Sequence, residues 1–143
     1  QITVVYDTMW EGTAKLAHAI AAELHKQNPE TVVKVFSLAK TDKNELMTEV
    51  FKSRAIAVGS PTVSNSYLSS MAGWLEFLKQ LKFKNKKAAA FGCYGWSGES
   101  GKLLQEKLQE AGFTVIEEHV RSQWNPEEAD FAAVPALAKV LLT

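Results

Sequence analysis

The sequence predicts an α/β protein in which a five-stranded parallel sheet carries helices on both faces. Short apolar runs rich in β-branched residues alternate with stretches whose apolar residues recur at helical spacing. Two of the inner runs, residues 55–58 and 88–91, are continuously small or branched and apolar, as in strands buried on both faces. Each right-handed crossover would then place its helix on one face or the other.

The five expected strands occur at regular intervals along the chain. They cover residues 2–6, 32–36, 55–59, 88–92 and 114–119. Five helices are expected between and after them, from apolar positions at 16–24, 46–51, 71–81 and 103–111, and from a last stretch at 126–142. Gly112 is suited to end the fourth helix. Asn125 and Pro126 are suited to begin the fifth, which Pro135 should kink or split.

Composition limits the function classes. The 143 residues are 46% apolar and 22% charged, which favours one globular domain over residues 1–143. The 16 basic residues balance the 16 acidic ones, so no nucleic-acid partner is indicated. No apolar run approaches the roughly 20 residues of a membrane span. The single cysteine, Cys93, excludes an internal disulfide and agrees with a cytoplasmic location.

The first predicted strand leads through residues 7–13 directly into a helix. The first turn of a helix has unpaired N–H groups at the positive end of its dipole, so an anion is stabilised there without a cationic side chain. Thr8 and Thr13 would add two hydroxyl donors, although Thr13 could instead act as the N-cap of its own helix. This pattern predicts a phosphorylated ligand.

Two further loops leave the same edge of the predicted sheet, residues 60–67 after the third strand and 93–101 after the fourth. Both combine hydroxyl side chains with aromatic rings, and the second is also rich in glycine. Together the three loops predict a pocket for a phosphorylated planar ring. Trp96 lies between Gly95 and Ser97, a poor setting for a core residue, which favours a ligand contact over a packing role.

With these three loops, the chain resembles a flavodoxin, and more closely the flavodoxin-like domain of flavodiiron proteins of the flavorubredoxin type. The resemblance covers essentially the whole chain. It rests on residues 6–9 leading to Thr13, on 59–62, on 86–98 and on 109–113. Where the usual flavodoxin loop has a glycine, this chain has Glu11 followed by Gly12, as expected in the flavodiiron branch. The implied strand order is 2-1-3-4-5, and the implied cofactor is non-covalent FMN.

The resemblance assigns cofactor-binding residues loop by loop. Those of the first loop would hold the phosphate through the two threonine hydroxyls and the backbone N–H groups of residues 9–13, while Trp10 could shield the ligand or lie on the surface. The other two loops would line the isoalloxazine ring, with Asn65 supporting a carbonyl near its N5 atom. The assigned residues are Thr8, Met9, Trp10, Glu11, Gly12, Thr13, Ser60, Pro61, Thr62, Asn65, Tyr94, Gly95, Trp96 and Gly98.

The resemblance implies a domain that relays single electrons within an oxidoreductase. The donor would be a rubredoxin or flavin reductase, and the acceptor an attached metallo-β-lactamase-like diiron domain that reduces oxygen or nitric oxide. A free-standing flavodoxin, a small FMN-dependent NAD(P)H-quinone reductase and an interaction module without flavin are the alternatives. The balanced charge favours an attached acceptor, because free flavodoxins are expected to be acidic.

Other polar residues are expected to be structural. His18, His25 and His119 lack a carboxylate at metal-ligand spacing, and no metal site is expected. Cys93 is expected to fill a small apolar space. The basic run 82–87 is expected to be a solvated turn, with docking as a weaker alternative. Receiver domains and nucleotide-binding enzymes are disfavoured, because the third strand ends without an aspartate and neither glycine-rich phosphate motif occurs.

Overall fold

The computed structural model describes residues 1–7, 12–60, 69–94, 99–123 and 128–143, and within them it has five strands in one parallel sheet. The strand order is β2-β1-β3-β4-β5, as expected. The strands are β1 (Ile2–Tyr6), β2 (Val33–Ser37), β3 (Ala55–Gly59), β4 (Lys87–Tyr94) and β5 (Thr114–Gln123). The helices are α1 (Gly12–Gln27), α2 (Lys43–Lys52), α3 (Ser69–Leu81), α4 (Glu99–Glu110) and α5 (Val134–Leu142), with short 3₁₀ turns at Leu38–Lys40 and Glu128–Ala133.

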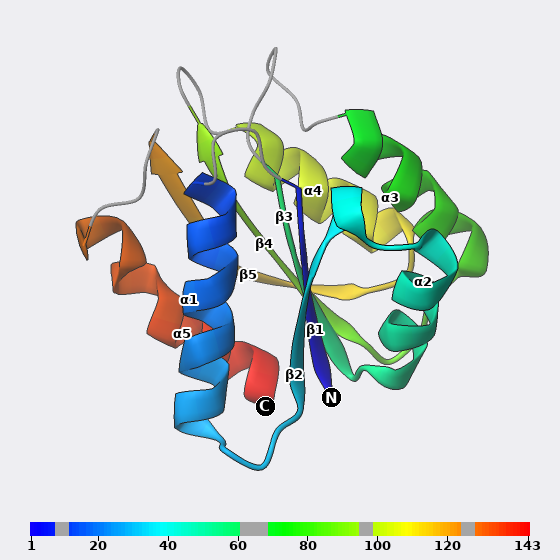
Figure 1. The fold of residues 1–143 in the computed structure, drawn as a ribbon. Coiled ribbons are helices and arrows are strands. Elements are labelled where there is room, and N and C mark those ends of the chain that lie inside the picture. The colour runs from blue at the N-terminus through cyan, green and yellow to red at the C-terminus, as the bar shows by residue number, and fades with distance from the viewer. Residues whose placement is uncertain (8–11, 61–68, 95–98, 124–127) are drawn as a thin grey trace.

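Helices cover both faces of the sheet. α1 and α5 pack on one face, and α2, α3 and α4 pack on the other, so the molecule has three layers with both chain ends at the same end of the sheet (Figure 1). Each interface has its own apolar cluster. Ile2 and Val4 of β1 belong to the α1–α5 cluster, whereas Val5 belongs to the α2–α4 cluster. This alternation is the two-residue period of a strand buried on both faces.

The last helix differs from its expected start. The expectation was a helix from Pro126, but the α-helix begins at Val134, after a 3₁₀ turn that ends at Ala133. Pro135 occupies the first turn of α5, where its missing N–H costs nothing, so it splits the expected helix as predicted. Asn125 and Pro126 lie outside the described residues.

Smaller differences concern strand ends. β2 runs one residue later than expected, and β4 and β5 continue to Tyr94 and Gln123, beyond the expected ends at 92 and 119. Gly59 at the end of β3 pairs with Phe91, so β4 extends three residues further than β3 at the carboxyl edge. β4 also pairs with β5, and a register shift between Ala88 and Ala90 marks a bulge in that pair. The α4 residue Gln105 donates a 3.2 Å hydrogen bond from Nε2 to the carbonyl of Ile116 there.

Candidate functional site

β1 and β3 are neighbours at the centre of the sheet, and the chain leaves them toward opposite faces. After β1 it continues to α1, and after β3 to α3, which lies on the other face (Figure 1). The ladder continues past both strand ends, because Asp7 N donates to Gly59 O at 3.0 Å and Ser60 N donates to Phe91 O at 3.3 Å. This reversal of strand order is where open α/β sheets form a ligand-binding crevice.

Gly59 is required for the close packing at this edge. A Cβ built on it would lie 2.1 Å from Cε2 of the Phe91 ring, far inside van der Waals contact. Phe91 is fully buried in the α1–α5 cluster, so its ring cannot move away cheaply. β3 therefore ends at Gly59, with no side chain over the Phe91 ring. Ser60 follows as a fully buried polar residue.

Thr13 provides a direct test of whether the first turn of α1 suits an anion. Its side chain is 1% exposed, and in the part of the chain that the structure describes Oγ1 has no hydrogen-bond partner. A buried hydroxyl without a partner costs about 1–3 kcal/mol, so such groups usually mark a missing ligand or water. Gly12, also buried, begins the helix beside it, and the N–H groups of this turn have no partner within the helix.

The alternative role of Thr13 as a helix N-cap does not hold. α1 begins at Gly12, so Thr13 lies inside the first turn, and its hydroxyl has no hydrogen-bond partner among the described residues. A 16-residue helix with a spare buried donor at its positive end fits a phosphate group.

The structure describes only some of the predicted site residues. Gly12, Thr13 and Ser60 lie at the carboxyl edge of the sheet, at the start of α1 and the end of β3. The backbone of Tyr94 ends β4 at the same edge. The remaining predicted positions lie outside the described residues: Thr8, Met9, Trp10, Glu11, Pro61, Thr62, Asn65, Gly95, Trp96 and Gly98.

Asp7 is a buried acidic residue at the same edge of the sheet that sequence reasoning did not single out. It follows β1 directly, is 4% exposed, and stands beside Ser60 because Tyr6 pairs with Gly59. An aspartate immediately after the first strand, next to a predicted anion loop, was the signal that could have identified it. The structure thus places a buried carboxylate at the crevice between β1 and β3.

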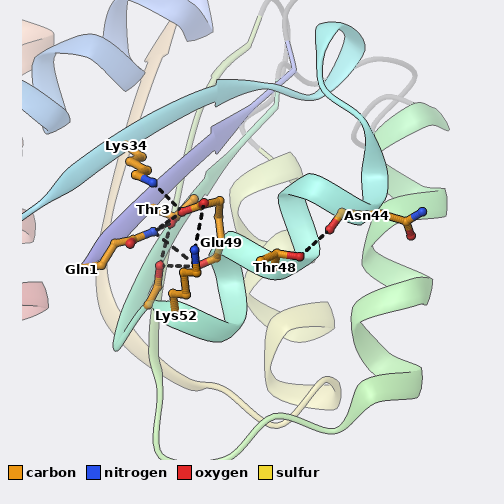
Figure 2. A network of polar contacts seen from close by, with 8 residues as sticks. Gln1, Thr3, Lys34, Asn44, Thr48, Glu49 and Lys52 are labelled. Carbon is orange, nitrogen blue, oxygen red and sulfur yellow. Dashed lines mark hydrogen bonds and ion pairs between the residues drawn. The ribbon is translucent and has the colours of Figure 1, made fainter.

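A second polar cluster lies at the opposite, amino edge of the sheet, around Glu49 of α2 (Figure 2). Gln1 Nε2 donates to Glu49 Oε2 at 2.6 Å, and the ammonium groups of Lys34 and Lys52 lie 3.1 and 3.9 Å from the carboxylate oxygens. The hydrogen bond from Gln1 and then Lys34 lower the pKa of Glu49 below its ordinary value, although burial opposes them. These groups partner one another, which suits a structural role rather than a ligand site.

The basic run at residues 82–87 is only partly the solvated turn that was expected. Lys82 and Lys84 are exposed, but Lys86 Nζ donates to the carbonyls of Phe51, at 3.0 Å, and of Ser53. Burial lowers the pKa of Lys86. Lys87 Nζ donates to Val140 O at 3.3 Å and to Thr143 Oγ1 at 3.1 Å. Adjacent lysines thus bind the C-terminal ends of α2 and α5, on opposite faces of the sheet.

The described residues 1–7, 12–60, 69–94, 99–123 and 128–143 contain no group of three or more His, Cys, Asp or Glu side chains able to hold a metal ion. Both His18 and His25 are exposed, and the His18 ring makes an edge contact with Tyr6 at 6.0 Å between centroids. Within the same described segments, no helix has the length and apolar character needed to cross a membrane.

Comparisons with known proteins agree with this geometry. The sequence model of the flavodoxin family matches residues 4–134. An anaerobic nitric oxide reductase flavorubredoxin from Aeromonas hydrophila is 41% identical over 132 residues, which is 92% of this chain and 26% of the relative. The chain thus spans about a quarter of the length of the curated relatives it matches.

Solved structures of related proteins also superpose on this chain. Rubredoxin oxygen:oxidoreductase from Desulfovibrio gigas superposes with a TM-score of 0.91 at 34% identity, covering 98% of this chain and 34% of that one. A flavodoxin from the domain Archaea superposes with a TM-score of 0.84 at 30% identity, covering 99% of this chain and 96% of that one. The first is a much longer protein, and the second is about the size of this chain.

Proposed function

Because this chain belongs to the flavodoxin family, whose members bind FMN, we propose that it is an electron-transfer domain that holds FMN at the carboxyl edge of its sheet. The observation that carries the proposal is the buried, unpartnered Oγ1 of Thr13 in the first turn of α1. A phosphate there would accept hydrogen bonds from this hydroxyl and from the N–H groups of the turn.

The remaining predicted residues would hold the ring. FMN supplies the redox chemistry, since it accepts and passes on electrons one at a time. Ser60 and the loop after it would line one side of the isoalloxazine, and Tyr94 with Gly95, Trp96 and Gly98 would line the other. β4 extends three residues past the end of β3, which supports this assignment because it carries Tyr94 to the edge where the crevice opens.

The proposed partners follow from the longer relatives. We expect the domain to receive electrons from a rubredoxin-type donor or a flavin reductase and to pass them to a diiron domain of metallo-β-lactamase type that reduces oxygen or nitric oxide. Support comes from the match to a flavorubredoxin and to a rubredoxin oxygen:oxidoreductase, each covered only in part by this chain. The net charge of zero also suits an acceptor that is attached rather than captured by electrostatic attraction.

The phosphate site is tested by removing the Thr13 hydroxyl while keeping its shape. Thr13→Val should weaken FMN binding about ten- to a hundredfold, because a hydrogen bond to a charged group contributes about 1.5–3 kcal/mol. Riboflavin, which lacks the phosphate, should bind both proteins equally. Titration of the apoprotein, followed by quenching of flavin fluorescence, measures both affinities.

Thr48→Val is the matched control, because Thr48 lies on α2, where its hydroxyl donates to the carbonyl of Asn44 in the same helix at 3.0 Å. It should leave FMN binding unchanged. If the unaltered protein fails to take up FMN, the proposal is wrong. If Thr13→Val lowers riboflavin and FMN affinity alike, the hydroxyl does not serve the phosphate.

The electron-relay role is tested separately with the FMN-loaded protein. Reduced rubredoxin, mixed anaerobically in a stopped-flow instrument, should bleach the flavin absorbance within the first seconds, whereas NAD(P)H alone should not. Rapid turnover of NAD(P)H with a quinone would instead support the reductase alternative.

A further inference from the structure

Three exposed apolar side chains lie on α2 and α3, which are neighbours on one face of the sheet (Figure 1). Phe51 of α2 is 56% exposed, and Phe77 and Leu81 of α3 are 39% and 38% exposed. Within the described segments the other exposed large apolar side chain is Val32, which lies before β2. A single exposed apolar residue needs no explanation, but several on one surface often mark an interaction site.

The two residues of α3 face α2. On the opposite flank of the helix, Lys79 Nζ lies 4.0 Å from a carboxylate oxygen of Glu110 in α4. Phe77 and Leu81 stand two positions before and after Lys79, which is about 200° around a helix. Because α3 lies between α2 and α4, both side chains point away from α4 and toward α2.

Phe51 joins this group from the end of α2. Its ring lies 4.9 Å from the ring of Phe83, in the turn directly after α3, and the Phe83 ring lies 5.1 Å from that of Phe113. Phe83 and Phe113 are buried, so Phe51 is the exposed end of a row of three rings. Phe51, Phe77 and Leu81 together are called the α2–α3 patch below.

The border of the α2–α3 patch is basic. Residues 77–87 contain five lysines and no acidic residue. Three of these lysines already have partners in the fold, namely Lys79, Lys86 and Lys87. Lys82 and Lys84 are exposed, and neither forms a hydrogen bond or ion pair within the described part of the chain. Their charges are therefore available to a partner beside the patch.

Lys82 has an unusual backbone conformation. Its φ is +50°, and among the described residues the other non-glycine position with positive φ is Asn85, at +59°. Asparagine tolerates this region, but lysine is uncommon there, and glycine is usual just after a helix end. The turn is nevertheless held firmly, since Phe83 N donates to Ala111 O at 2.9 Å. Backbone strain of this kind tends to be retained at functional sites.

We propose that the α2–α3 patch, with Lys82 and Lys84 at its border, binds an acidic amphipathic helix of a partner protein. Phe77 and Leu81 lie one helical turn apart, about 6 Å, so apolar side chains one turn apart on a partner helix would meet both. Carboxylates on that helix would pair with the two lysines and would disfavour basic partners.

The α2–α3 patch lies away from the proposed FMN crevice. Phe51 and Leu81 stand at the ends of α2 and α3 that lead into the amino ends of β3 and β4, whereas the crevice is at the carboxyl edge. A helix bound to the patch would therefore leave the crevice open. The proposal adds a docking function to the domain and does not depend on the cofactor.

A membrane surface fits the α2–α3 patch less well than a protein does. Segments that bind at a membrane surface bury their apolar side chains about 5–10 Å deep in the headgroup region. Phe77 and Leu81 are more than half covered by the protein itself, which leaves little of them to insert. Partly covered side chains with flanking charges suit a packed helix.

The test uses a synthetic 16-residue helix-forming peptide that carries leucine on one face and glutamate on the other. The peptide is labelled, and its fluorescence polarisation is followed as the protein is added, at about 50 mM NaCl, with and without FMN. We expect saturable binding of one peptide per chain, with the same affinity in both conditions. A peptide of the same composition in scrambled order should bind at least about tenfold more weakly, because its apolar face is lost.

The apolar contribution is tested with Phe77→Gln and Leu81→Gln. Each should weaken peptide binding about tenfold, because a side chain that the peptide would remove from water becomes polar. Val32→Gln is the matched control, since it alters an apolar side chain of similar exposure outside the patch, and it should leave the affinity unchanged.

Lys82→Gly separates docking from structure. Glycine adopts a positive φ without strain, so this variant should be more stable than the unaltered protein in urea denaturation. It should nevertheless bind the peptide about threefold to fivefold more weakly, because a charge at the border is lost. Lys139→Gln, at an exposed position of α5 on the other face of the sheet, is the charge control and should bind normally.

Three results would overturn the proposal. The first is no binding of the peptide, or equal binding of the scrambled peptide. The second is an unchanged affinity in Phe77→Gln, Leu81→Gln and Lys82→Gly. The third is binding to phosphatidylglycerol vesicles in place of the peptide, lost in the same variants, which would assign the patch to a membrane.

Discussion

Two buried threonines, one at each edge of the sheet, differ in the hydrogen bonds of their hydroxyl groups. Thr3 is fully buried, and its hydroxyl lies 2.6 Å from Ser53 Oγ, which donates in turn to Glu49 O at 2.7 Å. Thr13 is as deeply buried, but its hydroxyl has no partner among the described residues. Their residue type and burial are alike, so only the hydrogen-bond partners distinguish them.

Glu49 should make the folding stability of the protein depend on pH. Its pKa is lowered in the folded state, so its contribution to stability is complete above its unfolded pKa, about 4.3, and is lost as the pH falls through the folded value. Glu49→Gln should be less stable than the unaltered protein at pH 7, and the difference should shrink as the pH falls from about 5 to 3. Urea midpoints across that range measure it.

The exposed Glu76 of α3 provides the control for that series. Glu76→Gln should stay close to the unaltered protein at every pH. If the Glu49→Gln difference is the same at pH 3 as at pH 7, the ionised carboxylate is not what stabilises the amino edge.

At the scale of elements, helix ends are fixed by specific backbone and side-chain bonds. α4 ends in a Schellman motif, in which Phe113 N donates to Leu108 O at 3.1 Å and Gly112 N donates to Gln109 O at 3.0 Å. Gly112 has φ +101°, a left-handed conformation, and the predicted C-cap is thereby confirmed. The turn between α3 and β4 is bonded to this helix end, because Phe83 N donates to Ala111 O at 2.9 Å.

Substitution of Gly112 should therefore be costly. A Cβ there would lie 2.0 Å from the carbonyl oxygen of Phe83, and the backbone φ is unfavourable for any other residue. Gly112→Ala should lower the free energy of unfolding by about 1–3 kcal/mol or more. Chemical denaturation monitored by circular dichroism gives this value.

Gly73, inside α3, is the matched glycine because a Cβ there would meet nothing within 4 Å. Gly73→Ala should raise stability by about 0.5–1 kcal/mol, since alanine is the better helix former. Equal effects of the two substitutions would contradict the role given to the cap.

At the scale of the whole molecule, the acidic and basic residues balance. The chain carries 16 basic and 16 acidic residues, and several lysines are committed to helix ends and to Glu49. A protein with no net charge gains little from long-range steering of a charged partner.

Electron transfer with a soluble rubredoxin-type donor should accordingly depend weakly on salt. Between about 50 and 500 mM NaCl, where the screening length falls from about 14 to 4 Å, the second-order rate constant should change less than about threefold. Stopped-flow reduction of the FMN-loaded protein measures it. A steep fall in the rate constant with ionic strength would show that local charge steers the encounter.

Much of the fold could be predicted from the chain because its signals are local. Apolar periodicity and a glycine stop determined the sheet class, the strand and helix order and the end of α4, each of which depends on neighbours in sequence. The turn proposed to bind phosphate could be predicted for the same reason, since a strand, a short polar loop and a helix start are contiguous. The FMN assignment came from the resemblance to flavodoxins, which the family match supports.

Only the tertiary structure decided which polar groups find partners. Lys86 and Glu49 bond to residues more than 30 positions away, and Asp7 meets Ser60 only because β1 and β3 are adjacent in the sheet. Hydrogen bonding and burial depend on neighbours in space, which periodicity does not encode. The sequence alone thus determined a parallel sheet with a helix start of the kind that binds anions. The packing of distant segments left Thr13 without a partner among the described residues and buried Asp7 at the carboxyl edge.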